Sequence, residues 1–234
     1  MKLYNLQDIR NVGLVGHGGS GKTSVAEAVL FLSGVNDRLG KVGDTSSIMD
    51  YDPDEIKRGH SINASLAYLE WKGNKINLID TPGTSNFVAD TPGCLRVVDG
   101  AVIVIGADAG VQYFTEKAWQ WINEFALQPI IFINKTDHEQ ANIDAALDSI
   151  KKRFKKKPVL LQIPVGAGEA FSGVVDLILK AYFSYDKGEG QGESKVVPEN
   201  LKEEMETRRG ELMESVAECD EILIEKYLEE GNLS

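Results

Sequence analysis

The chain has 234 residues, of which 42% are apolar and 26% are charged, as is ordinary for a globular protein with one sizeable core and a smaller unit. It contains neither an apolar run long enough to cross a bilayer nor a secretion signal, and its two cysteines, Cys94 and Cys219, lack metal-ligand spacing, so we expect a cytoplasmic protein with free thiols. The net charge is −11, and residues 186–233, with 15 acidic and 6 basic side chains, argue against a nucleic-acid-binding surface there.

The first motif is a glycine-rich segment at residues 16–23, which matches the phosphate-binding pattern G-x-x-x-x-G-K-[ST]. Residues 10–15 predict a buried strand before it, and residues 24–32 have helical spacing after it. The glycines are expected to take positive φ angles and to bring backbone N–H groups close to phosphate oxygens, at a helix N-terminus that favours anions. The predicted nucleotide-binding residues are His17, Gly18, Gly19, Ser20, Gly21, Lys22, Thr23 and Ser24.

Two residues of this loop have predicted roles of their own. Lys22 is expected to act as a point charge on the terminal phosphates, and the Thr23 hydroxyl is expected to bind Mg²⁺. A glycine-rich turn with an incidental lysine is the alternative, and the flanking strand and helix argue against it.

The next segment, residues 33–59, is rich in Gly, Asp and Ser and lacks an apolar period, so it predicts a long loop. Residues 61–71 and 76–80 predict a hairpin of two strands. A helix is expected between residues 86 and 98, where Pro92 should limit it.

Buried strands at residues 101–105 and 130–133, with a helix at 115–125, complete the pattern. Nearly continuous apolar strands that alternate with helices predict an α/β fold, with a mainly parallel sheet flanked by helices. Binding residues should then lie at the carboxyl ends of the strands.

Two more motifs follow strand ends. After residues 76–80 comes Asp80-Thr81-Pro82-Gly83, in which Asp80 would hold Mg²⁺ through water and the Gly83 N–H would sense a γ-phosphate. After residue 133 comes Asn134-Lys135-Thr136-Asp137, in which Asp137 can accept hydrogen bonds from guanine N1–H and its amine. Asn134 and Lys135 would buttress the base, and adenine would leave Asp137 unpaired. Together the motifs predict a P-loop GTPase that binds GTP or GDP with Mg²⁺.

The whole chain also resembles the amino-terminal part of the bacterial elongation factor G family, and most closely its elongation-factor-G-like paralogues. Met49-Asp50-Tyr51 and Arg58-Gly59-His60-Ser61-Ile62 resemble the first switch, where R-G-I-T-I is usual, so the resemblance implies that Ser61 binds Mg²⁺. Residues 98–101, 110–111 and 115–116 resemble the segment after the second switch.

Residues 162–182 resemble the start of an insert that this family and its release-factor relatives carry inside the G domain. The resemblance implies a G domain at 1–157, incomplete without a closing strand beyond Ser234, and an α+β acidic insert at 158–234 whose helices span about 198–230. In the alternative, residues 165–168 are the base-binding loop of a small GTPase and 173–177 begin a closing helix. The longer match favours the insert.

Three departures from the family pattern bear on the hydrolysis rate rather than on binding. Thr84 stands where the family has the histidine that positions water, Gly19 replaces an acidic residue, and His60 replaces the isoleucine of the first switch. His17 matches the histidine of the family's loop and is expected to be structural.

The resemblance implies a ribosome-associated translational GTPase that catalyses attack of water on GTP, with Lys22, Gly83 and Thr84 at the reacting phosphate. The alternatives are a GTP-binding regulatory module with little hydrolysis and a tetracycline-resistance or release-factor type of GTPase. The resemblance places a stalk-protein contact on the acidic insert, and a merely solvated helical face is the alternative. The basic run at 151–157 either contacts phosphates or complements a helix end. We expect a monomer without membrane or sequence-specific nucleic-acid partners.

Overall fold

The structure is a computed structural model that describes residues 2–43, 45–185, 192–231 and 233. The chain divides into two compact units, Met1–Lys155 and Lys156–Ser234. Within the described residues, no helix combines the length and the apolar character needed to span a membrane.

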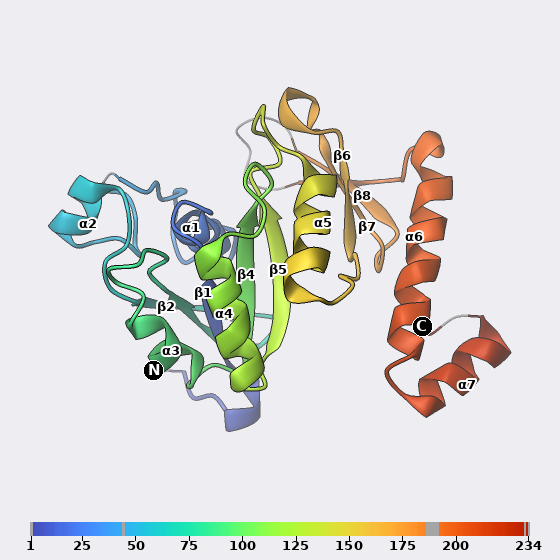
Figure 1. The fold of residues 1–234 in the computed structure, drawn as a ribbon, viewed down its shortest axis with the longest axis horizontal. Helices are drawn as coiled ribbons and strands as arrows, with labels where there is room; N and C mark the ends of the chain where they lie inside the picture. The colour runs from blue at the N-terminus through green and yellow to red at the C-terminus, as the bar shows by residue number, and fades with distance from the viewer. Residues whose placement is uncertain (1, 44, 186–191, 232, 234) are drawn as a thin grey trace. The chain divides into compact units, whose positions relative to one another are not determined.

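The first unit is built on a five-stranded, mainly parallel sheet in the order β2-β3-β1-β4-β5 (Figure 1). β1 runs parallel to β3 and β4, and β4 runs parallel to β5, while β2 and β3 form the expected antiparallel hairpin. The carboxyl ends of the four parallel strands therefore share one edge of the sheet. The strands are β1 (Ile9–Val15), β2 (Ser65–Trp71), β3 (Asn74–Asp80), β4 (Gly100–Gly106) and β5 (Gln128–Asn134).

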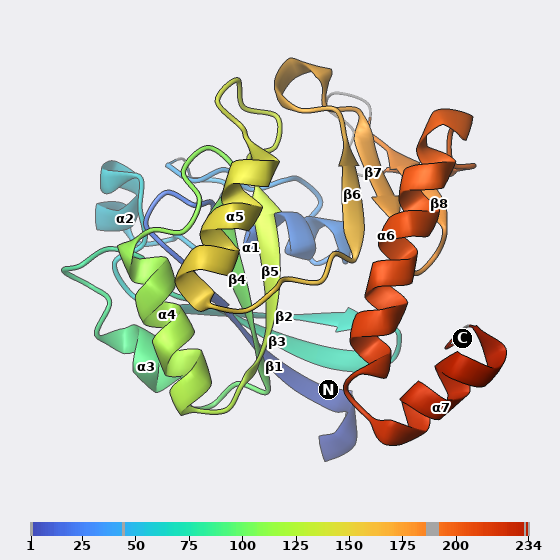
Figure 2. The same ribbon diagram turned by 45° about the vertical axis from the view of Figure 1, so that its right-hand side comes forward.

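Helices cover both faces of this sheet, as Figure 1 and Figure 2 show. On one face, α1 packs Ala26 and Leu30 against Leu14 and Leu78 of the strands. The other face holds the larger core, to which α3, α4 and α5 contribute. The helices are α1 (Lys22–Leu32), α2 (Pro53–Arg58), α3 (Asp90–Leu95), α4 (Tyr113–Glu124) and α5 (Ile143–Phe154), with a short 3-10 helix at Leu6–Asp8.

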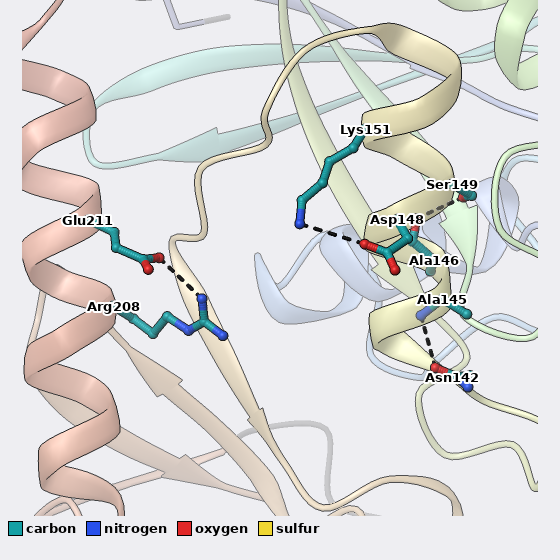
Figure 3. A network of polar contacts seen from close by, with 8 residues as sticks. All are labelled: Asn142, Ala145, Ala146, Asp148, Ser149, Lys151, Arg208 and Glu211. Carbon is teal, nitrogen blue, oxygen red and sulfur yellow. Dashed lines mark hydrogen bonds and ion pairs between the residues drawn. The ribbon is translucent and has the colours of Figure 1, made fainter.

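Helix α5 has well-defined ends. At its start, the Asn142 side chain accepts a hydrogen bond from the Ala145 N–H at 2.9 Å, as Figure 3 shows. At its end, Lys151, Lys152 and Arg153 occupy the last turn. Because cations are favourable near the carbonyl groups of a helix end, this part of the basic run lies where it complements the helix dipole.

Two expectations for the first unit are wrong. Residues 33–59 are not loop throughout, because α2 forms within them: Asp52 caps the helix through the Asp54 N–H and Gly59 ends it in a left-handed conformation. Strand β5 is not fully buried, since Ile130 and Phe132 are exposed. Among the described residues β5 is one of the two edge strands of this sheet, and the α1 core lies over β1, β2 and β3.

The second unit has a four-stranded antiparallel sheet in the order β6-β7-β8-β9, packed against α6 through Val175, Leu177, Met205 and Leu212. Its residues 173–176 form a strand, so the alternative of a closing helix there is wrong. The predicted acidic helices are confirmed, whereas Asp186 and Glu189 of the acidic stretch lie outside the described residues. The elements are β6 (Gln162–Val165), β7 (Gly173–Asp176), β8 (Ala181–Ser184), β9 (Glu193–Lys195), α6 (Glu199–Ala217), α7 (Glu221–Glu230) and a 3-10 helix at Gly168–Ala170.

Candidate functional site

The glycine-rich loop connects β1 to α1 at the carboxyl edge of the sheet. Gly16 has a φ of 147°, and a Cβ atom there would collide with the Val104 carbonyl oxygen. The expectation of positive φ is wrong for Gly18, which is a glycine for a different reason: a Cβ atom would lie 3.0 Å from Thr84 Cγ2. The loop thus depends on close approach as well as on backbone freedom.

The segment after β3 lies directly against this loop. The Gly18 N–H donates a hydrogen bond of 2.8 Å to the Gly83 carbonyl oxygen. A Cβ atom on Gly83 would collide with Lys22 Nζ and would lie 2.7 Å from the Gly16 carbonyl oxygen. Lys22 Nζ donates to the His17 carbonyl oxygen at 3.1 Å. The phosphate loop and the D-T-P-G motif are therefore in contact, as their strand ends predict.

Buried hydroxyl and carboxylate groups meet beside the first turn of α1. Thr23 Oγ1 donates to Asp80 Oδ2 at 2.6 Å and lies 3.1 Å from Ser61 Oγ. Ser61 Oγ donates in turn to Asp50 Oδ1 at 2.8 Å. Sequence reasoning missed Asp50 as a site residue, although it had placed residues 49–51 in the first switch. We refer to Thr23, Asp50, Ser61 and Asp80 as the oxygen cluster.

The oxygen cluster suits a hard cation. Asp80 Oδ1 and Asp50 Oδ2 are buried and accept no hydrogen bond from the described part of the chain. Carboxylate and hydroxyl oxygens are the ligands that Mg²⁺ prefers, directly or through water. No group of three or more His, Cys, Asp or Glu side chains among the described residues is arranged to hold a metal, so any cation here would rely on hydroxyl oxygens too.

Burial dominates the electrostatics of the site. It lowers the pKa of Lys22, against the opposing effect of the Asp80 and Asp50 carboxylates. It also raises the pKa of Asp80 to about 6, against the opposing effects of Lys22 and the Thr23 hydrogen bond. The pKa of Asp50 is raised mainly by burial, and the Ser61 hydrogen bond opposes that shift. Opposite charges are thus held together in a poorly solvated site.

The N-K-x-D motif reaches the phosphate loop from the end of β5. Asn134 Nδ2 donates to the Ser20 carbonyl oxygen at 2.9 Å, which ties the two motifs together. Lys135 has a φ of 61°, and its Nζ forms an ion pair of 3.2 Å with Asp108, which the sequence did not single out. Asp137 is exposed just beyond them.

Three of the four residues that were compared with the family pattern, Thr84, His60 and His17, have different surroundings. Thr84 Oγ1 is buried and has no hydrogen-bond partner among the described residues. The His60 ring lies 6.1 Å from the Phe87 ring, so it bridges the segments that follow α2 and β3. The His17 ring stacks on Phe114 at 5.6 Å, which suits a structural role.

A phosphate loop after β1, a D-T-P-G motif after β3 and an N-K-x-D motif after β5 define a P-loop GTPase fold. The chain belongs to the family described as elongation factor Tu GTP binding domain, whose model matches residues 7–230.

Individual relatives agree with this assignment. The chain is 39% identical to Elongation factor G 2 of Desulfotalea psychrophila over 98% of this chain and 34% of that protein. It is 38% identical to Elongation factor G of Thermotoga petrophila over 100% of this chain and 34% of that protein. A crystal structure of a protein from Thermus thermophilus is similar to this chain, with a TM-score of 0.86 and 32% identity. The match covers 94% of this chain and 33% of the Thermus chain. The chain therefore spans about a third of the length of the curated relatives it matches.

The raised pKa of Asp80 predicts how stability depends on pH. Because the folded value of about 6 exceeds the ordinary 3.8, the stability that protonated Asp80 contributes is complete below about pH 4 and lost as the pH rises through 6. In EDTA, Asp80→Asn should therefore raise the free energy of unfolding at pH 7 by about 1–3 kcal/mol and change it little below pH 4.

Urea unfolding of the variant and the unmutated protein from pH 4 to 7 measures this difference. Asp37→Asn, at an exposed position, should be neutral throughout. A difference between Asp80→Asn and the unmutated protein that does not change with pH would contradict the assignment.

Proposed function

We propose that this chain binds GTP and GDP together with Mg²⁺, and hydrolyses GTP, as the nucleotide-binding part of an elongation-factor-G-like translation factor that acts on the ribosome. One observation carries the proposal: three motifs far apart in sequence are joined at one edge of the sheet. The joining hydrogen bonds run from Thr23 to Asp80, from Gly18 to Gly83 and from Asn134 to Ser20.

In this proposal the loop from His17 to Ser24 binds the phosphates through its backbone N–H groups, and Lys22 neutralises their charge. Thr23 and Ser61 would be ligands of Mg²⁺, and Asp80 would hold it through water. When bound, the metal ion would neutralise charge that develops on the phosphates. The buried, unpartnered oxygens of the oxygen cluster support this assignment.

Guanine specificity is assigned to Asp137, whose exposed carboxylate can accept hydrogen bonds from donors that guanine presents and adenine lacks. Asn134 holds the base motif against the phosphate loop, as its bond to Ser20 suggests. Lys135, which Asp108 orients, would pack its aliphatic stem beside the base. The site therefore reads the base with one carboxylate and positions it with two neighbours.

For hydrolysis, Lys22 and the Gly83 N–H would stabilise charge on the γ-phosphate while water attacks it in line. Thr84 occupies the position of the water-orienting histidine in the resembling family. Its hydroxyl has a shorter reach than an imidazole and cannot carry a positive charge. The second candidate function, a GTP-binding regulatory module with little hydrolysis, is favoured by this residue.

We assign the binding of a ribosomal partner to the acidic surface of α6. Glu203, Glu204, Glu211 and Glu214 are exposed there, and the first three line a shallow depression along the helix. Glu211 pairs with Arg208 at 3.1 Å, and this exposed ion pair, drawn in Figure 3, stabilises the helix little. Most of the acidic charge is thus available to a basic partner, such as a stalk protein of the ribosome.

Guanine recognition is tested by two substitutions. Asp137→Asn should weaken GTP binding by about 10–100-fold, because two hydrogen bonds to the base are lost, and should shift preference toward xanthosine nucleotides. Lys22→Ala should abolish tight triphosphate binding. Competition against a fluorescent GTP analogue measures both, and Asp144→Asn, at an exposed position nearby, is the matched control. Equal affinity of the unmutated protein for ATP and GTP would rule out this site assignment.

The role of residue 84 is tested by restoring the ring. GTP hydrolysis by the unmutated protein should be slow, and Thr84→His should raise it by about 10²-fold or more with little change in GTP affinity. Single-turnover rates with and without ribosomes measure the effect. Thr84→Leu adds bulk without a ring nitrogen and should not raise the rate. A fast rate in the unmutated protein that Thr84→His fails to raise would show that the water is positioned by other means.

The acidic surface is tested by neutralising Glu203, Glu204, Glu211 and Glu214 to glutamine. Ribosome-stimulated turnover should fall, and its dependence on salt should weaken, because long-range attraction between unlike charges is screened by ions. If both stay unchanged, the surface is merely solvated. The matched control neutralises four exposed carboxylates of the first unit, Asp37, Glu124, Asp144 and Asp148.

A further inference from the structure

Two buried glutamates outside the oxygen cluster, Glu27 and Glu55, accept hydrogen bonds from residues 47–63. This segment contains Asp50 and Ser61 of the cluster. Glu27, on α1, is fully buried. Its Oε1 atom accepts three hydrogen bonds, from Ser47 Oγ at 2.7 Å, the Ile48 N–H at 2.6 Å and the Met49 N–H at 2.8 Å. One carboxylate oxygen thus accepts hydrogen bonds from three consecutive residues, 47–49, which lie in neither a helix nor a strand.

Glu55 makes the corresponding contact at the other end of the segment. It is buried on the short helix α2, and its Oε1 accepts from the Ile62 N–H at 2.8 Å and the Asn63 N–H at 3.1 Å. Hydrogen bonds to a charged acceptor are stronger than those between neutral groups. Glu27 and Glu55 therefore hold residues 47–49 and 62–63, and we call them the two carboxylate anchors.

The anchored residues flank both loop members of the oxygen cluster. Asp50 follows the first anchored stretch, and its N–H donates to Ser47 Oγ at 2.9 Å. Ser61 precedes the second stretch. Glu27 also lies four residues after Thr23, so both side chains project from the same face of α1. Hydrogen bonds link Glu27 through Ser47 and Asp50 to Ser61, whose Oγ atom lies 3.1 Å from Thr23 Oγ1.

We propose that Glu27 and Glu55 are positioning residues that preform the Asp50 and Ser61 side of the Mg²⁺ site, Glu27 by holding residues 47–49 against α1 and Glu55 by tying residues 62–63 back to α2. This inference rests on the proposed function, because it takes the oxygen cluster as the metal site. Burying a carboxylate is costly, and an apolar side chain that filled the same space would accept no hydrogen bond. The N–H groups of residues 48, 49, 62 and 63 need acceptors, and the anchors supply them.

Gly40 provides a way to disturb the first anchor without removing its charge. A Cβ atom at this position would collide with the Glu27 carboxylate and would lie 3.0 Å from the Ser46 carbonyl oxygen. Gly40 does not have a positive φ, so alanine is compatible with its backbone. Gly40→Ala should therefore displace Glu27 from residues 47–49.

The test measures release of a fluorescent GTP analogue from the chain as a function of free Mg²⁺. Glu27→Met and Glu55→Met, which keep the length of the side chain but remove the acceptor, should each need about tenfold more Mg²⁺ for half-maximal slowing of release. Gly40→Ala should reproduce the effect of Glu27→Met. Glu27→Gln and Glu55→Gln retain an oxygen acceptor and should stay within about threefold of the unmutated protein. Release in EDTA should change less than about twofold in every variant, because the hydrogen bonds described above join the anchors to residues 47–49 and 62–63.

Asp54→Asn is the matched control, since Asp54 is the exposed neighbour of Glu55 on α2. If release from the unmutated protein does not respond to Mg²⁺, the proposed metal site itself fails. If release from the unmutated protein responds to Mg²⁺ and the two methionine variants behave like Asp54→Asn, the positioning role of the anchors is overturned. The assignment of the metal site then stands. If the variants bind the GTP analogue equally more weakly with and without Mg²⁺, the positioning role is also overturned, because this result shows a general loss of structure.

If the methionine variants do not fold, amide hydrogen exchange decides the question. In the unmutated protein, the amides of Ile48, Met49, Ile62 and Asn63 should exchange more slowly than the exposed amides of residues 37–39. Glu27→Gln should speed exchange at residues 48 and 49, and Glu55→Gln at residues 62 and 63. Fast exchange of these four amides in the unmutated protein overturns the proposal.

Discussion

The structure of the site depends on one constraint, the burial of opposite charges where β1 and β3 end. Lys22 and Asp80 are both almost inaccessible to water, and burial opposes the charged form of each. The lysine and the carboxylate partly offset each other, and Asp50 adds a second buried carboxylate to the same surroundings. A buried charged group is tolerated only where compensating charges and hydrogen bonds lie nearby. That requirement explains why Thr23 donates to Asp80 and Ser61 donates to Asp50. The same poor solvation would strengthen the interaction of Lys22 with a phosphate.

The sequence predicts the parts of this arrangement that are encoded locally. Glycine spacing identifies the phosphate loop, and Asp80 and Asn134 each end an apolar strand, so parallel pairing alone brings the motifs to one edge. Asp50, Glu27, Glu55 and Asp108 could not be predicted in the same way, because their partners are distant in sequence and no periodicity marks them. A weak signal existed for Glu27, which is a charged residue within an otherwise apolar turn of α1. Helix α2 was missed because its short sequence is defined by its ends, Asp52 and Gly59, rather than by an apolar stripe.

Apolar runs were the other limit of sequence reasoning. The run at residues 130–133 predicts a strand correctly but does not reveal whether both faces are covered, and in β5 Ile130 and Phe132 are exposed on one face. Residues 173–177 are too short for periodicity to separate a helix from a strand. They form a strand because they pair with both β6 and β8, and Val175 of this strand lies in the core of the second unit. In both places the outcome depends on neighbours that the segment itself does not encode.

The proposed binding and hydrolysis steps would depend on different kinds of atoms in this site. Gly83 is enclosed by Lys22 Nζ, the Gly16 carbonyl oxygen and the Gly18 N–H, so its backbone position is fixed by the phosphate loop and not by the side chain at residue 84. The position of residue 84 follows from that of Gly83, and its side chain lies beside Gly18. A different side chain at residue 84 therefore changes reach and charge without moving the backbone that holds the phosphate loop. In the proposed function, nucleotide affinity would rest on backbone N–H groups and Lys22, and it would be separable from a hydrolysis rate that depends on how one side chain orients water. A threonine at residue 84 would therefore leave the proposed nucleotide-binding contacts in place.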